Sequence, residues 1–183
     1  MKGTVPNCMQ SLVIHRFGES QWKRSLAAAG LAASTDYSAQ SNVDDGEVLA
    51  LIRGIGEANS LAPAEVMQAF GEYWSSVYAP VIYQSFYEAP KSTREFLLGL
   101  DAMHIALTRI LKDVQLPRFT YEWQGENHLV MHYRSTRNMV GLMPGMVTGL
   151  GIHFGDAPKV WLEGNAVHVV FNDESISPEG MES

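Results

Sequence analysis

Three side chains that can bind an anion occur at every second position of one segment: Tyr133, Ser135 and Arg137. If the segment is extended, its period of two places all three on one face. That face would offer a phenol, a hydroxyl and a guanidinium, which can donate two parallel hydrogen bonds to a carboxylate. Leu129 and Met131 precede them on the same face, so we expect the face to begin in the core, where an unpaired guanidinium is costly. The triplet predicts carboxylate binding; an ordinary polar strand face is the alternative.

A histidine upstream of this triplet, His104, lies within an apolar stripe. The stripe comprises Leu97, Leu100, His104, Leu107 and Leu111. Spacings of three and four place these residues on one inward face of a helix. A lone histidine on such a face is more often a satisfied core residue than a metal ligand. However, one nitrogen ligand together with a carboxylate-binding triplet is what a haem requires: a histidine for the iron and the triplet for the propionates.

The combination resembles the haem-nitric oxide/oxygen binding (H-NOX) family, which includes the haem domain of soluble guanylate cyclase. That family carries a proximal histidine on a helix and a later Tyr-x-Ser-x-Arg motif, which the triplet matches. The opening residues 1–5 and the segment 69–74 are also similar to the family. The resemblance extends from Met1 to about Phe171.

The resemblance implies a non-covalently bound haem b with five-coordinate ferrous iron on His104. It assigns Tyr133, Ser135 and Arg137 to propionate binding. It also implies that Pro117 presses on the porphyrin face together with an aliphatic residue, for which Val5 stands here. A proline that simply ends a helix is the alternative for Pro117.

Six residues are implied to line the distal side of the haem, where a gas would bind. They are Val5, Met9, Trp74, Tyr78, Leu142 and Met146. Oxygen-binding members carry a tyrosine nine residues after the motif tyrosine, and this chain has Leu142 there. An apolar pocket should favour nitric oxide and carbon monoxide, because a donor matters most where charge develops in a dry site. Trp74 and Tyr78 own donors, so an oxygen-binding haem module stays open, although both residues could equally be aromatic core.

The function implied is a haem-based gas sensor rather than an enzyme. Nitric oxide would bind opposite His104, break the iron–histidine bond and shift the N-terminal helices against the sheet. A separate signalling protein, such as a histidine kinase or a cyclic-di-GMP enzyme, would read the change. A haem peroxidase or oxygenase would need a distal acid–base group, which the expected lining does not offer. A haem-free domain, with Arg137 holding a ligand carboxylate, is the remaining alternative.

Composition narrows the class of protein. The chain has 183 residues, 46% of them hydrophobic, which suits one domain enclosing an apolar ligand. A net charge of −7, with no run of Lys and Arg longer than two, disfavours nucleic acid binding. Without a long apolar run or a signal peptide, we expect no membrane insertion and a cytoplasmic location. The single cysteine, Cys8, excludes an internal disulfide.

The predicted fold class is α+β, with a helical N-terminal lobe of about residues 1–60 and an antiparallel sheet lobe with packed helices, the haem lying between them. Helices are expected at 9–17, 20–29, 44–59, 63–78 and 80–86, and from Ser92 onward, with Pro117 ending the helical region. Strands are expected at 119–123, 128–135, 159–162 and 166–171. The segment 138–151 should be helical but interrupted near Pro144. The haem-binding domain spans 1–171, and the polar tail 172–183 is expected to be disordered.

Overall fold

The computed structural model describes residues 1–111 and 114–172. Its helices are α1 (Thr4–Phe17), α2 (Glu19–Ala28), α3 (Asp45–Asn59), α4 (Pro63–Tyr73), the π-helix η1 (Trp74–Tyr78), α5 (Ala79–Ile82), α6 (Gln84–Glu88), α7 (Thr93–Ile110), the 3₁₀ turn η2 (Val140–Leu142) and α8 (Met143–Phe154). Its strands are β1 (Arg118–Trp123), β2 (His128–Arg134), β3 (Lys159–Glu163) and β4 (Ala166–Val170). The strands form one antiparallel sheet in the order β1-β2-β4-β3. The predicted α+β class is confirmed.

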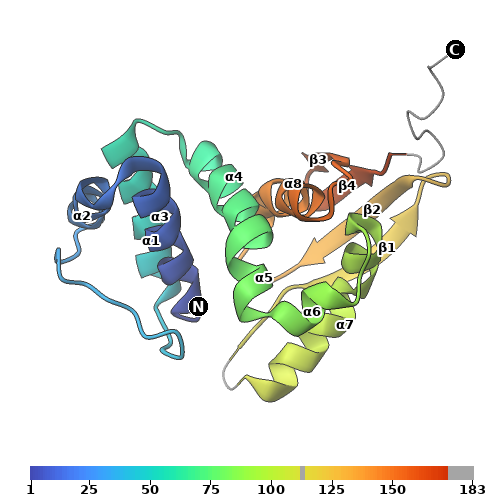
Figure 1. Ribbon diagram of the computed structural model, residues 1–183, viewed down its shortest axis with the longest axis horizontal. Helices are drawn as coiled ribbons and strands as arrows, with labels where there is room; N and C mark the ends of the chain where they lie inside the picture. The colour runs from blue at the N-terminus through green and yellow to red at the C-terminus, as the bar shows by residue number, and fades with distance from the viewer. Residues whose placement is uncertain (112–113, 173–183) are drawn as a thin grey trace, which may run out of the picture.

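The molecule has two lobes, each with its own core. Figure 1 shows α1, α2 and α3 at one end and the sheet with α6, α7 and α8 at the other, with α4 and α5 running between them. One cluster of buried side chains extends from Cys8 to Phe70 and includes Leu142. A second cluster joins α7 and α8 to the inner face of the sheet, where Leu129, Met131 and Val169 are fully buried. Sequence alternation had predicted that inner face for β2.

The N-terminal lobe follows most of its sequence signals. Asp44 begins α3 as predicted, because its carboxylate accepts a hydrogen bond from the amide of Gly46 at 2.8 Å. α1, however, begins at Thr4 and not at the predicted Met9. The sequence pattern missed the first turn because Thr4, Pro6 and Asn7 have low helix propensity. Pro6 lies within the turn, where a missing N–H costs no helical hydrogen bond.

Two predicted helices are divided where the chain passes from one lobe to the other. The helix expected at 63–78 is α4 followed by η1, in which the Ala79 amide donates to the Trp74 carbonyl five residues back. π-helices are rare and often lie at functional sites. The helix expected at 80–86 is also broken, because Tyr83 has a non-helical backbone (φ −125°, ψ 36°) between α5 and α6.

Several boundaries around the sheet lobe also differ from prediction. α7 begins as expected, with Ser92 Oγ accepting from the Glu95 amide at 3.2 Å. It ends at Ile110, so the prediction that Pro117 ends the helical region is wrong. β2 ends at Arg134, which leaves Ser135 outside the strand.

Pro144 starts a helix where an interruption was predicted. It lies in the first turn of α8, where a proline needs no N–H. The residues before it form the 3₁₀ turn η2. Within the tail, Asn172 donates hydrogen bonds to the carbonyls of Asp156 (2.8 Å) and Ala157 (3.2 Å). The rest of the predicted disordered segment, 173–183, lies outside the described residues.

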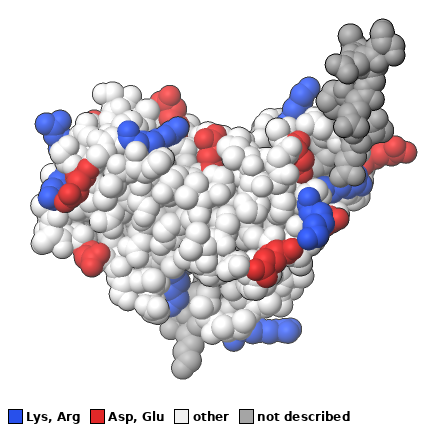
Figure 2. All heavy atoms as spheres, in the orientation of Figure 1, with Lys and Arg blue, Asp and Glu red and all other residues white. Residues whose placement is uncertain are grey.

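The surface carries charge of both signs. Figure 2 shows acidic and basic side chains scattered over one face, with wide uncharged areas between them. Over residues 1–111 and 114–172, no helix combines the length and apolar character needed to cross a bilayer.

α4 and α8 cross at glycines, and this crossing joins the two lobes. A Cβ on Gly145 would lie 2.3 Å from the carbonyl oxygen of Gln68, and one on Gly71 would lie 2.6 Å from the amide of Met146. Both distances are too short for any larger side chain. The helices therefore approach backbone to backbone at this crossing, beside the cavity described below.

Gly145→Ala should destabilise the protein by about 1–3 kcal/mol, because the added methyl group meets backbone that must move. Denaturant unfolding measures the change. Gly99→Ala is the matched control, since a Cβ there meets nothing within 4 Å. That change should be neutral or stabilising by up to about 1 kcal/mol. Equal stability of Gly145→Ala and wild type would contradict the close crossing.

Candidate functional site

A large cavity lies between the two lobes. It contains about 1390 Å³ of empty space, its open mouth included. Its wall comes from the start of α1, from η1 and α5, from α7, from the segment before β1, from the end of β2 and from α8. Most lining residues are apolar, with a few polar groups among them. Such a wall is typical of a site for a large apolar ligand with polar ends.

The predicted apolar stripe of α7 forms one side of the cavity. Leu97, Leu100, His104, Leu107 and Leu111 all line it. The helical spacing therefore identified correctly which face of α7 points inward. His104 is the residue of this face that can ligate a metal.

His104 is held by a backbone acceptor that sequence reasoning did not name. Its Nδ1 lies 2.8 Å from the carbonyl oxygen of Pro117. A carbonyl oxygen only accepts hydrogen bonds, so Nδ1 carries the proton and the lone pair of the neutral ring is on Nε2. Burial lowers the pKa of His104, although the contact with Pro117 and the charge of Asp101 oppose the shift. The ring is therefore neutral at neutral pH, the state in which imidazole binds metals.

The turn of α7 before His104 is fixed to β1. Asp101 accepts hydrogen bonds at 2.8 Å from Arg118 Nε, from Arg118 Nη2 and from the amide of Phe119. The bonds from Arg118 lower the pKa of Asp101 to about 2. The carboxylate thus stays ionised at neutral pH. It ties the helix to the segment whose Pro117 carbonyl orients His104.

The triplet predicted to bind a carboxylate also lines the cavity. Tyr133, Ser135 and Arg137 are all part of the wall, although only Tyr133 lies in β2. The hydroxyl of Ser135 accepts a hydrogen bond from the amide of Arg137 at 3.2 Å. The side chain of Arg137 donates through Nη1 to the carbonyl of Gln115. The structure therefore brings the triplet and His104 to one cavity, as the sequence predicted.

Arg137 also has an acidic partner that the sequence did not reveal. Its Nε donates to Asp45 Oδ2 at 2.7 Å, and the amino group of Met1 donates to Asp45 Oδ1 at the same distance. Burial alone would raise the pKa of Asp45, but these two hydrogen bonds outweigh it and lower the pKa. Asp45 belongs to α3, so the contact links the helical lobe to the sheet lobe. A guanidinium has five N–H donors, so this network still permits a fork onto a ligand carboxylate.

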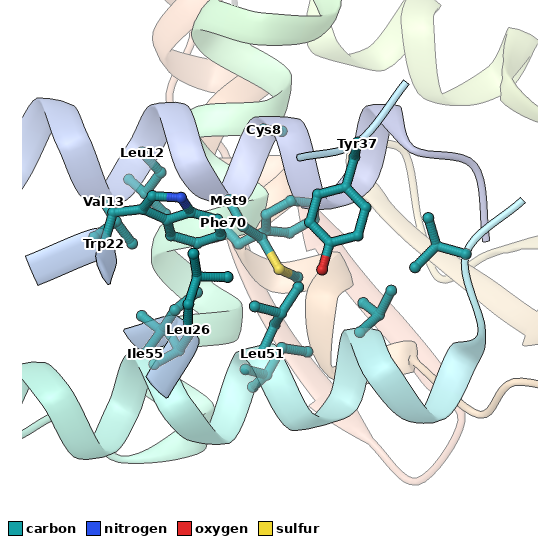
Figure 3. Packing of buried hydrophobic residues seen from close by; sticks show 14 of the residues in the cluster. Cys8, Met9, Leu12, Val13, Trp22, Leu26, Tyr37, Leu51, Ile55 and Phe70 are labelled. Atoms are coloured by element: carbon teal, nitrogen blue, oxygen red, sulfur yellow. The ribbon is translucent and has the colours of Figure 1, made fainter. Parts of the chain in front are cut away.

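The predicted distal residues are only partly brought together. Val5, Trp74, Leu142 and Met146 line the cavity. Met9 is fully buried in the core of the helical lobe, where Figure 3 shows it beside Phe70 and Leu51. The family resemblance had implied that Met9 lines the cavity. Met9 points the other way because that face of α1 packs on α3 and α4.

Tyr78 also lies outside the cavity wall. Its ring lies 5.7 Å from that of Trp74 and packs on the core of the helical lobe. Trp74 contacts both cores and forms the wall in its place.

Polar residues that the sequence did not identify also face the cavity. Among them are Thr4, Ser75, Tyr83 and Tyr87. Burial raises the pKa of the Tyr83 hydroxyl, and its hydrogen bond with Thr4 opposes the shift. Burial likewise raises the pKa of Tyr87, which hydrogen-bonds Ser75. No periodic signal marks Ser75, Tyr83 and Tyr87, because the π-helix and the break at Tyr83 decide which way they point.

The residues of this cavity fit a haem. His104 presents one unprotonated nitrogen, and Arg137 with Ser135 supplies donors for acidic groups. Over the described ranges, no group of three or more His, Cys, Asp and Glu side chains lies together to hold a bare metal ion. A porphyrin would supply the remaining ligands of an iron held by His104.

Known proteins resemble this chain over most of its length. A family model described as haem-NO-binding matches residues 2–161. The soluble guanylate cyclase gcy-37 of Caenorhabditis elegans is 26% identical over 153 residues, which are 82% of this chain but only 21% of the cyclase. This chain thus spans about a fifth of that relative's length.

Solved structures share the fold. An unliganded Fe(II) H-NOX mutant from K. algicida has a TM-score of 0.82 at 23% identity, covering 96% of this chain and 98% of its own. An Fe(II) H-NOX mutant from S. oneidensis has a TM-score of 0.84 at 16% identity, with 97% and 100% covered. An oxygen-binding H-NOX domain related to soluble guanylate cyclases has a TM-score of 0.78 at 19% identity, with 97% and 98% covered. From the family match over nearly the whole chain, this protein belongs to the haem-NO-binding (H-NOX) family of haem-binding, gas-sensing domains.

Proposed function

We propose that this chain is a haem-based sensor of nitric oxide that passes its signal to a separate protein. His104 would hold the iron of haem b through Nε2, and Tyr133, Ser135 and Arg137 would hold the propionates. The observation that carries the proposal is the 2.8 Å contact between His104 Nδ1 and the Pro117 carbonyl. It leaves the other ring nitrogen as the lone-pair donor inside a cavity of suitable lining.

Haem bound here would supply a ferrous iron that can bind a diatomic gas. The residues around His104 fix its position. Asp101 and Pro117 tether it to the start of β1, so release of the imidazole from its ligand would free the C-terminal half of α7 to move with that segment.

Arg137 is the residue best placed to carry the change to the helical lobe. Its guanidinium lines the cavity and donates to Asp45 of α3. If a propionate shares this guanidinium, a change in the position of the propionate alters the contact with Asp45. The arrangement of the lobes would then depend on the ligand. By thermodynamic linkage, the factor by which the ligand shifts the lobe equilibrium is also the factor by which the lobe arrangement changes ligand affinity.

The apolar distal residues favour nitric oxide over oxygen. Leu142 stands where oxygen-binding relatives carry a tyrosine, and Val5, Met146 and Leu142 line the cavity without donors. Carbon monoxide, which also needs no donor, should bind as well. Oxygen binding is the second candidate, because Trp74 and Tyr83 carry donors and also line the cavity. One similar structure is described as an oxygen-binding domain.

Only the relatives bear on the kind of effector. The C. elegans relative is a soluble guanylate cyclase. A cyclase domain, a histidine kinase or a cyclic-di-GMP enzyme would each suit a sensor whose two lobes move against one another.

The absorption spectrum of the reduced protein tests the proposal. Protein from haem-sufficient cells should be red, and its spectrum should change under nitric oxide but not under air. His104→Gly should lose most of its haem unless free imidazole is supplied, because the iron has then lost its protein ligand. A colourless wild type, or unaltered haem content in His104→Gly, would sink the proposal. Negligible peroxide turnover would dispose of the peroxidase alternative.

Arg137→Ala should speed haem loss to an excess of apomyoglobin by about tenfold, as a charge-assisted hydrogen bond is worth about 1.5–3 kcal/mol. Ser135→Ala should have a smaller effect. Asp45→Asn is the control, because it weakens the contact between the lobes and leaves Arg137 free to bind a propionate. Retention that falls equally in Asp45→Asn and Arg137→Ala would show that Arg137 acts through lobe packing instead.

Leu142→Tyr should create or strengthen an oxygen-bound species in air, because a phenol would donate to the bound gas. Oxygen titration of the reduced protein measures it. If wild type already binds oxygen, Tyr83→Phe shows whether Tyr83 is the donor. No gain of oxygen affinity in Leu142→Tyr would contradict the placement of Leu142 beside the gas.

A further inference from the structure

The hydroxyl of Tyr121, a residue of β1, contacts two backbone groups of helix α7, at a position called the Leu97–Asp101 rung below. Tyr121 Oη donates to the carbonyl oxygen of Leu97 at 2.9 Å and accepts from the amide of Asp101 at 3.2 Å. These are the two groups that a single i→i−4 hydrogen bond of an α-helix joins. Insertion of a side chain into this ladder is a known cause of helix bending. The rung precedes His104 on the same helix.

The two halves of α7 are held differently. At the N-terminal end, the amide and hydroxyl of Thr93 donate to the two carboxylate oxygens of Asp156 at 2.7 and 2.6 Å. Thr93, Phe96, Leu97 and Leu100 are all buried. This half is therefore fixed to the core of the sheet lobe.

The C-terminal half is less buried. No residue from 101 to 110 is fully buried. Its described polar ties run from Asp101 to Arg118 and Phe119, and from His104 to Pro117. Beyond Asp101, and among the described residues, this half contacts the sheet-lobe core only at its edge, through Met103 and through the ring of His104 against Phe119. It is therefore held less firmly than the N-terminal half.

A glycine lies within the same rung. Gly99 is exposed, and a Cβ built there would meet nothing within 4 Å, so packing does not require a glycine at this position. Glycine weakens a helix interior because its backbone has more freedom to lose. The residue type with the most flexible backbone therefore lies between the two residues that the Tyr121 hydroxyl contacts.

We propose that the Leu97–Asp101 rung is a hinge on which the half of α7 that bears His104 pivots, with Tyr121 as its positioning residue. The hydroxyl keeps the Leu97 carbonyl and the Asp101 amide hydrogen-bonded when the rung opens, so pivoting leaves neither group unpaired. The event that drives the pivot, release of His104, rests on the proposed function. The hinge itself belongs to the fold.

Amide hydrogen exchange of the full-length chain tests the hinge without reference to haem. Tyr121→Phe lets the rung close directly, and Gly99→Ala removes the freedom of the glycine. Both should slow exchange of the amides of residues 102–110, by about fivefold for Gly99→Ala. Tyr37→Phe is the control: it removes a tyrosine hydroxyl bonded to Glu47 at 2.7 Å in the other lobe, and should leave α7 unchanged. Faster exchange in Tyr121→Phe would show that the hydroxyl stabilises the helix at this position and would contradict its role in a hinge. Unchanged exchange in both variants would exclude the hinge.

A second readout tests the link to His104. With nitric oxide bound, electron paramagnetic resonance gives the share of molecules in which His104 has left the iron. A stiffer hinge should lower that share in Tyr121→Phe and Gly99→Ala but not in Tyr37→Phe. An unchanged share would overturn the link. If the purified chain holds no haem, the proposed function fails while hydrogen exchange still decides the hinge.

Discussion

The hydrogen bond from His104 Nδ1 to the Pro117 carbonyl is the constraint on which the site depends. It decides the tautomer, since a carbonyl cannot donate, and therefore decides which nitrogen can meet a metal. It also joins the ring to the chain at Pro117, directly before Arg118 and Phe119, which both donate hydrogen bonds to Asp101. In the proposed site, one imidazole would thereby be both the metal ligand and a connection between α7 and the sheet.

The second connection runs across the lobes. Arg137 touches Gln115 beside the cavity and Asp45 in α3, so the group suited to bind a ligand carboxylate also contacts the helical lobe. Beside it, α4 and α8 meet backbone to backbone where Gly145 lies against Gln68.

Residue spacing correctly predicted which side chains face inward where they lie on a regular helix or strand. The stripe containing His104 lines the cavity because α7 is a regular helix, and Leu129 and Met131 are buried because β2 alternates. The resemblance correctly gathered Arg137 with them. Sequence failed where irregular backbone or distant contacts decide. Met9 turned away because its face of α1 packs in the helical lobe, and Asp45 is paired with Arg137 across 92 positions, which no local pattern encodes.

Resonance Raman spectroscopy of the reduced protein under argon most directly tests whether His104 is bound to iron. We predict an iron–imidazole stretching band in wild type that disappears in His104→Gly and returns when free imidazole is added. The absence of such a band in the wild-type protein, or its persistence in His104→Gly without imidazole, would show that another group holds the metal and would contradict the site described here.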